Sequence, residues 1–105
     1  MKVRVDSGVC RFITNITASC EDMQNVTLDI ESQCPHIQKI GEQLKQVDAY
    51  KEIFSKLNNS IVYTIAAHNI AHIACPVPSA ILKAVEAAAG FALPRDVHIS
   101  MYGEE

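Results

Sequence analysis

Two stretches of alternating side chains, joined by a short polar link, constrain this fold more than any other feature. From Val9 to Cys20, the even-numbered positions carry small and apolar side chains, with the odd-numbered positions on a second face. From Val26 to Ile30, apolar residues alternate with polar ones. A period of two is typical of a strand with one buried face. Because only residues 21–24 separate the two stretches, the sequence predicts a β-hairpin.

The register of this hairpin follows from the need to bury both apolar faces on the same side of the sheet. Pairing Ala18 with Val26 meets this need, and continuing the ladder brings Cys10 opposite Cys34. Residues directly opposite each other have Cβ atoms about 4.5–5.5 Å apart. A slip of two residues keeps the same faces and leaves the two thiols near neighbours. We therefore expect Cys10 and Cys34 to lie close together.

Four helices are expected after the hairpin. The first begins at Pro35, since proline suits the first helical turn. Asp48 can cap a short second helix and Ser60 a third that runs to about Ile73. The fourth opens at Pro76 and ends before a glycine. The apolar positions expected to face inward are, in chain order, Ile37, Ile40, Leu44 and Val47, then Ile53, Phe54 and Leu57, then Ile61, Val62, Ile65, Ala66, Ile70 and Ile73, then Ile81, Leu82, Val85 and Ala88.

Two further strands are expected near the chain ends. Val97, Ile99 and Met101 alternate with polar residues, which predicts a C-terminal strand, and residues 2–6 can add a short edge strand. The predicted fold is α+β and forms a single domain over residues 1–105. Its hairpin and C-terminal strand form a small, mainly antiparallel sheet, with about four helices packed on one face.

Composition narrows the class of protein. Of 105 residues, 49% are hydrophobic and the net charge is -3, which favours a globular chain and a single domain. The basic residues are scattered and tryptophan is absent, so nucleic-acid binding is not expected. The first residues carry no apolar run typical of a signal peptide, and no stretch is long enough to span a membrane. We therefore expect a cytoplasmic protein whose four cysteines are reduced.

Two cysteines occur just before prolines at predicted helix starts. They are Cys34, before Pro35, and Cys75, before Pro76. A helix N-terminus offers free N–H groups and partial positive charge, both of which stabilise the thiolate that binds metals. With Cys10 on the same predicted face, these thiols form a candidate metal site. The simpler interpretation is that each cysteine packs as a small hydrophobic residue.

Histidines precede the second of these cysteines. His68 and His72 are four residues apart and would share a helix face. The predicted ligand set is Cys10, Cys34 and Cys75, with His72 as a fourth ligand, and it suits zinc or an iron–sulfur cluster. Three thiolates without the histidine would leave one position open. Cys20 is expected at the hairpin tip and is excluded from the site.

Two resemblances bear on these cysteines. The run from Cys75 to Pro78 opens a helix and resembles the Cys-Pro-x-Pro motif of TusA/SirA-type sulfur carriers. That resemblance implies that Cys75 carries a persulfide. The whole chain also resembles a small uncharacterised family of prokaryotic, largely anaerobic origin. The motifs that carry this likeness are Cys10 with Phe12, Cys34-Pro35-His36-Ile37, and Ala74-Cys75-Pro76-Val77-Pro78 with the later Ala92-Leu93-Pro94.

Three functions therefore remain open. The first is a protein that binds zinc or an iron–sulfur cluster through Cys10, Cys34 and Cys75, in redox or sulfur metabolism. The second is a sulfur carrier in which Cys75 accepts the persulfide and another thiol resolves it. The third is a metal-free interaction module, expected to be homo-oligomeric. No reaction is assigned, since no paired carboxylates, nucleophile elbow or phosphate loop marks an active site.

Overall fold

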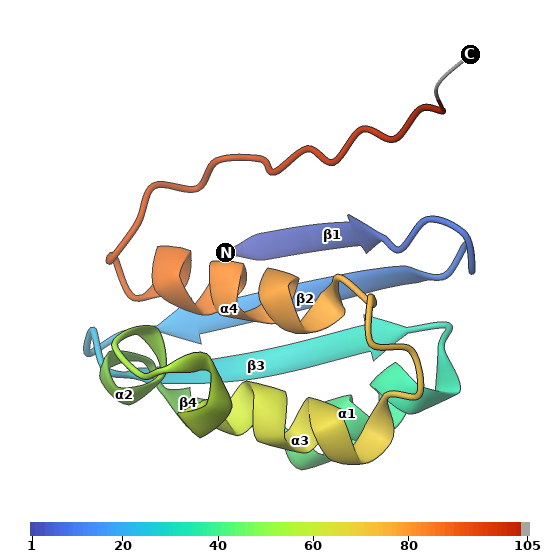
Figure 1. The fold of residues 1–105 in the computed structure, drawn as a ribbon. Helices are drawn as coiled ribbons and strands as arrows, with labels where there is room; N and C mark the ends of the chain where they lie inside the picture. Colours follow the sequence, from blue (N-terminus) through green and yellow to red (C-terminus); the bar gives the residue numbers. More distant parts are fainter. Residues whose placement is uncertain (104–105) are drawn as a thin grey trace.

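The computed structural model describes residues 1–103, in which one antiparallel sheet carries helices on a single face (Figure 1). The sheet has the strand order β1-β2-β3-β4. Its strands are β1 (Lys2–Asp6), β2 (Ile13–Cys20), β3 (Asn25–Ser32) and β4 (Gln46–Asp48). The helices are α1 (Pro35–Gln43), α2 (Ala49–Ile53), the 3-10 turn η1 (Leu57–Asn59), α3 (Ile61–Asn69) and α4 (Val77–Ala88). The α+β class, the antiparallel sheet and its single covered face are as predicted.

The predicted hairpin is present, and its register differs by two residues from the one expected. Ala18 pairs with Leu28, and Ile16 pairs with Ile30. Both registers bury the same side chains, so the alternation could not separate them. The connection between β2 and β3 selects the observed register. In it, the side chain of Asp22 accepts hydrogen bonds from the backbone N–H groups of Gln24 and Asn25, at 3.0 and 2.8 Å.

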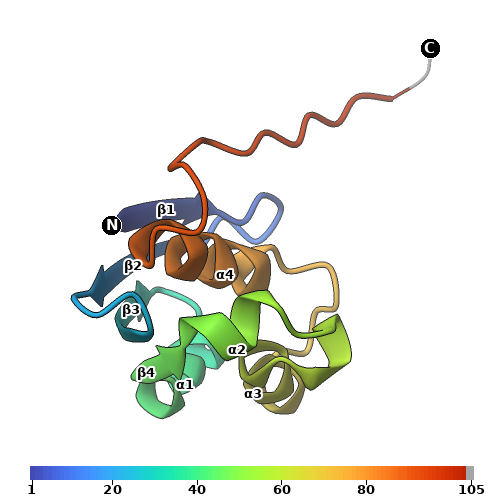
Figure 2. The same cartoon turned by 90° about the vertical axis from the view of Figure 1, so that its left-hand side faces the viewer.

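The core lies between the inner face of the sheet and the helices. The inner positions of β2 and β3 are nearly all buried, and α1 and α4 pack on them. The approach of α1 is very close: a Cβ on Gly41 would stand 2.9 Å from the backbone oxygen of Ile30. In Figure 2, α4 and α1 lie over the sheet, and α3 packs beside them. The helices thus form one layer above one sheet.

Helix boundaries follow local capping signals where these exist. Asp48 accepts a hydrogen bond from the Lys51 N–H at the start of α2, and Ser60 accepts one from the Tyr63 N–H at the start of α3. At the end of α4, Gly90 has φ +83° and the Phe91 N–H donates to the Glu86 carbonyl at 2.9 Å. This is a Schellman ending. The three predicted signals are confirmed.

Several finer predictions for the helices were wrong. Val47 does not continue α1 but lies in β4, opposite Val26, a three-residue strand too short to show alternation. Phe54 and Leu57 are mostly exposed, because α2 ends at Ile53. The third helix stops at Asn69, so Ile73 stands fully in solvent instead of facing the core. Among the described residues, no helix is long and apolar enough to cross a membrane.

The predicted C-terminal strand is not formed. Residues 91–103 contain no helix or strand, and the segment runs away from the body of the protein (Figures 1 and 2). Val97, Ile99 and Met101, expected to face inward, are 61%, 77% and 90% exposed. A strand requires a partner edge, and this segment pairs with none in the structure. The edge strand at residues 2–6 is present as β1 and pairs with β2.

Candidate thiol site

Three segments from distant parts of the chain meet at one end of the sheet, on the right in Figure 1. They are the β1–β2 connection, the β3–α1 junction and the turn that precedes α4. Hydrogen bonds join the first two: the Ile13 N–H donates to the Gln33 side chain at 3.2 Å, and the Gln33 N–H to the Ile13 carbonyl at 3.5 Å. Each segment carries one of the cysteines predicted to form a site.

Cys34 is the N-cap residue of α1. Its backbone is extended, with φ -79° and ψ 123°, and its side chain makes no capping hydrogen bond. The Cys34 N–H instead donates to the Ser32 hydroxyl at 3.1 Å. The side chain is half-buried and packs against the core. Its sulfur is therefore held in place without a hydrogen bond to the helix that it begins.

Cys75 lies in a turn directly before α4. Its N–H donates to the His72 carbonyl at 3.1 Å, and its half-buried side chain packs against the core. Burial raises the pKa of the Cys75 thiol, while a hydrogen bond from the Val77 N–H lowers it. Negative charge on Cys34 and Cys10 raises this pKa further. Cys34 and Cys10 are thus close enough for their charge to act on the Cys75 thiol, although burial has the larger effect on its pKa.

Cys10 reaches this end of the sheet from a loop, not from a strand as predicted. β2 begins at Ile13, and Cys10 is exposed in the connection that precedes it. The loop turns through two left-handed residues, Gly8 at φ +87° and Arg11 at φ +63°, and the Arg11 N–H donates to the Gly8 carbonyl at 2.8 Å. The opposition of Cys10 and Cys34 in a ladder is thus wrong, although both influence Cys75.

The histidines lie apart from any helix face shared with the site. His72 is exposed in the turn before Cys75, because α3 has already ended. The His68 ring nitrogen Nδ1 lies 2.8 Å from the Thr64 carbonyl oxygen within α3. His36 is exposed in the first turn of α1. As the side chains stand in residues 1–103, no three His, Cys, Asp or Glu residues form a group that could hold a metal ion.

Cys20 lies at the opposite end of the hairpin, as expected. It pairs with Val26 in the ladder, is half-buried, and its thiol donates to Asp22 at 3.9 Å. It packs against the same core as Cys34 and Cys75. Cys20 is therefore a matched internal control for any test of the other three thiols.

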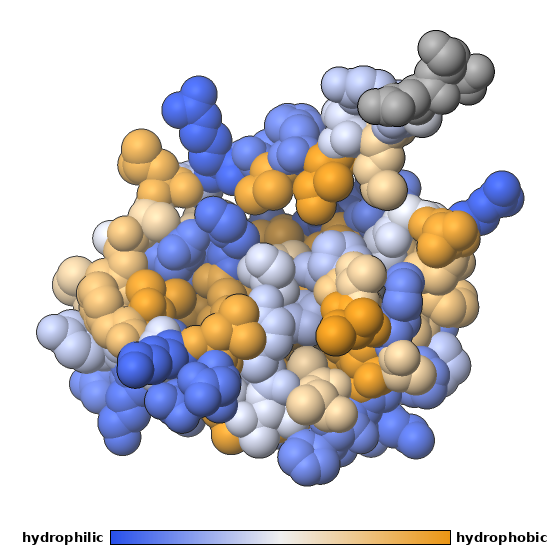
Figure 3. Space-filling model, in the orientation of Figure 1, coloured by the Kyte–Doolittle hydropathy of each residue, from blue (hydrophilic) through white to orange (hydrophobic). Residues whose placement is uncertain are grey.

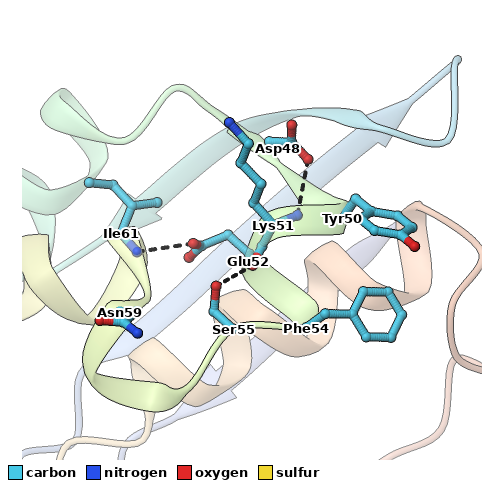
Figure 4. Close-up of a pocket in the computed structure, with 8 residues that line it drawn as sticks. All are labelled: Asp48, Tyr50, Lys51, Glu52, Phe54, Ser55, Asn59 and Ile61. Carbon is cyan, nitrogen blue, oxygen red and sulfur yellow. Dashed lines mark hydrogen bonds between the residues drawn. The ribbon is translucent and has the colours of Figure 1, made fainter.

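A buried carboxylate was not anticipated from the sequence. Glu52 is 7% exposed and lines a pocket between α2 and the start of α3, beside the rings of Tyr50 and Phe54 (Figure 4). Its oxygens accept hydrogen bonds from the Ser60 hydroxyl and from the N–H groups of Ile61 and Val62. Nothing in the local pattern signals this role, since the partners lie eight to ten residues further along the chain.

The fold and this end of the sheet define a class: a small α+β protein in which three cysteine-bearing segments lie at one end of an antiparallel sheet. The chain belongs to a family described as "Family of unknown function (DUF6951)", which matches residues 1–101. The membership agrees with the expected uncharacterised family. No curated protein and no solved structure matches the chain.

Proposed function

We propose that this protein binds an iron–sulfur cluster, or zinc, through Cys10, Cys34 and Cys75. The fourth position would be taken by His72 or by a ligand from outside the chain. The observation that carries the proposal is the convergence of three cysteine-bearing segments at one end of the sheet (Figure 1). Three cysteine thiolates are a common ligand set for zinc and for clusters.

Two of these thiols have local surroundings suited to a ligand. Cys34 caps α1 without using its sulfur, and Cys75 accepts a hydrogen bond from the first residue of α4. Hydrogen bonds from backbone N–H groups to cysteine sulfurs tune clusters and stabilise thiolates. Both side chains also pack against the core, which fixes their positions. Because the two side chains are already ordered, less conformational entropy is lost when a metal or cluster binds.

A cluster places looser demands on the positions of its cysteine ligands than a single zinc ion does. Each sulfur around one zinc ion must lie about 2.3 Å from the metal, so the ligands crowd together. In a cluster the cysteines ligate different irons, so their sulfurs stand further apart. Charge on Cys34 and Cys10 acts on Cys75, and yet no three ligands among residues 1–103 form a group that could hold a single metal ion. We therefore place the cluster before zinc in the proposal.

Of the competing functions, the sulfur carrier is less well supported. A carrier needs a nucleophilic, accessible thiolate. Cys75 is half-buried, and burial raises the pKa of its thiol, so less of it is ionised at neutral pH. Its hydrogen bond from Val77 acts in the opposite direction and is the smaller effect.

The experiment is metal analysis of the full-length protein purified without oxygen. Iron, acid-labile sulfide and zinc are measured per chain, with a visible spectrum. We expect iron with sulfide if a cluster is bound, or about one zinc per chain if a single ion is bound instead. Cys10→Ala, Cys34→Ala and Cys75→Ala should each lose it. Cys20→Ala, a matched half-buried cysteine, should retain it.

Two results would overturn the proposal. One is apo-protein that takes up neither a cluster from ferrous iron and sulfide nor added zinc under reducing conditions. The other is equal loss in Cys20→Ala and Cys34→Ala, which would mean that folding, not ligation, was damaged. His72→Ala then separates a histidine ligand from an external one: only a histidine ligand changes the spectrum when removed.

A further inference from the structure

The C-terminal segment has the pattern of a strand, and within residues 1–103 no strand pairs with it. Val97, Ile99 and Met101 alternate with His98, Ser100 and Tyr102. The five large apolar side chains from Leu93 onward are between 61% and 91% exposed. In Figure 3, orange side chains of this segment stand out along the top of the molecule. An apolar, unpaired, extended segment is unstable in water unless something covers it.

The sheet offers one edge of matching length. In the part of the chain that the structure describes, β1 pairs with β2 alone, which leaves its other edge free over Lys2–Asp6. The opposite edge, β4, has three residues and runs directly into α2. The inner face at the β1 edge is also incompletely covered, since Val3 is only half-buried there. A fifth strand beside β1 would therefore find both free backbone groups and an apolar surface.

We propose that the C-terminal segment of one copy pairs with β1 of a second copy, so that two chains exchange strands. The C-terminal segment and the free edge of β1 can each supply the partner strand that the other needs. Strand addition to a free edge gains backbone hydrogen bonds, and alternate side chains supply specificity. A symmetric pair makes the contact twice.

One antiparallel register satisfies both faces. If Ile99 lies opposite Val5, then Met101 lies opposite Val3, and all four side chains fall on the helix-covered side. On the other face, the same register brings His98 opposite Asp6 and Tyr102 opposite Lys2, pairs of complementary character.

A second copy fits this edge better than the chain's own segment. In Figure 1 both β1 and the segment run from left to right, so pairing within one chain would be parallel. Parallel pairing is slightly less stable per residue than antiparallel pairing. Phe91 is also anchored against Tyr50 and Phe54, with ring centroids 6.1 and 5.6 Å apart, and from there the segment leaves the body.

The test is the mass of the full-length protein in solution, measured by light scattering and sedimentation across a dilution series with a reductant present. Wild-type protein should have twice the chain mass. The backbone groups of Arg4 face the free edge, because Val3 and Val5 direct theirs toward β2 in the register set by the Met1–Ala18 hydrogen-bonded pair. Ser100 lies opposite Arg4 in the proposed register, so Ser100→Pro removes a ladder N–H and should be monomeric at concentrations where wild type is dimeric. Ser100→Ala keeps that N–H and should remain dimeric. Ser100 is exposed and lies outside every helix and strand, so Ser100→Pro should fold, which circular dichroism checks.

Hydrogen exchange then locates the contact. In the dimer, the amides of His98 and Ser100 and those of Arg4 and Asp6, which face each other in the proposed register, should be protected together and should lose that protection on dilution. A wild-type monomer at every concentration would overturn the proposal. So would a dimer that Ser100→Pro leaves intact, because its interface would lie on another surface. A monomer with protected amides in residues 97–101 would show that the segment pairs with its own chain, and also overturns it.

Discussion

The Glu52 carboxylate accepts a 2.8 Å hydrogen bond from the Ser60 hydroxyl, and both groups are buried. The same carboxylate accepts from the N–H groups of Ile61 and Val62, at 3.0 and 3.1 Å. These are the first residues of α3, whose N–H groups have no partner within the helix. Glu52 thus joins α2 to the start of α3, and its negative charge lies at the positive end of that helix.

Removing this carboxylate should cost more than removing an ordinary surface glutamate. Glu52→Ala leaves buried donors unpaired, so we expect the free energy of unfolding to fall by about 2–3 kcal/mol. Glu42→Ala, on the exposed face of α1, should stay within about 0.5 kcal/mol of wild type. Urea unfolding measures both. Equal effects of the two substitutions would contradict the capping role.

The close approach of α1 to the sheet predicts that Gly41→Ala lowers the stability of the protein, which is opposite to the usual effect of this change in a helix. In a helix interior this change normally stabilises by about 1 kcal/mol. Here the new Cβ would stand 2.9 Å from the backbone oxygen of Ile30, so α1 must shift away from β3. Overpacking of this kind costs about 1–3 kcal/mol. We expect a net loss of stability by urea unfolding, and a stabilised Gly41→Ala protein would show that α1 packs more loosely.

Substitutions at Gly90 and Gly103 distinguish the effect of backbone strain from the general effect of replacing a glycine. Gly90 has φ +83° at the end of α4 and nothing within 4 Å of an added Cβ, and Gly103 has equally open space. An L-residue in the left-handed region costs about 1–2 kcal/mol. Gly90→Ala should therefore lower the thermal midpoint while Gly103→Ala leaves it unchanged. Identical midpoints would mean that α4 does not require its Schellman ending.

The hairpin connection predicts a pH dependence in the acid range. Hydrogen bonds from the backbone N–H groups of Asn25 and Gln24 and from the Asn25 side chain lower the pKa of Asp22 to about 2. An unfolded aspartate titrates near about 3.9. The stabilisation is therefore present above that value and is lost as the pH falls towards about 2.

Carbon NMR of the Asp22 carboxyl group measures this pKa directly. Asp22→Asn should remove its share of the acid dependence of stability between the two pKa values, and Asp6→Asn is the comparison on another exposed aspartate. An ordinary pKa at Asp22 would contradict the hydrogen bonds that define the connection.

Local patterns predicted much of this fold. Alternation identified the inner faces of β2 and β3, and side-chain capping predicted the starts of α2 and α3 at Asp48 and Ser60. These features depend on residues within one or two turns of each other, so a single sequence contains the whole signal. β4 gave no such signal, because three residues cannot show a period.

The candidate site was predicted only in part. The sequence identified Cys34 and Cys75 at helix starts, and the structure has both there. It could not place Cys10, which reaches that end of the sheet from a loop that turns through Arg11 in a left-handed conformation. Nor could it anticipate that α3 ends at Asn69 and leaves His72 in a turn. Whether the three thiols bind a metal stays a prediction.

By itself, the sequence determined which side chains face inward and where helices begin, because those choices follow from spacing and from caps close along the chain. Only the tertiary structure decided that residues 46–48 pair with β3 as a fourth strand, that three cysteine-bearing segments lie at one end of the sheet, and that Val97, Ile99 and Met101 stay exposed. Each of these depends on a partner far away in the sequence or outside the chain. A strand pattern cannot form hydrogen bonds alone, so residues 97–101 stay unpaired until an edge is offered to them.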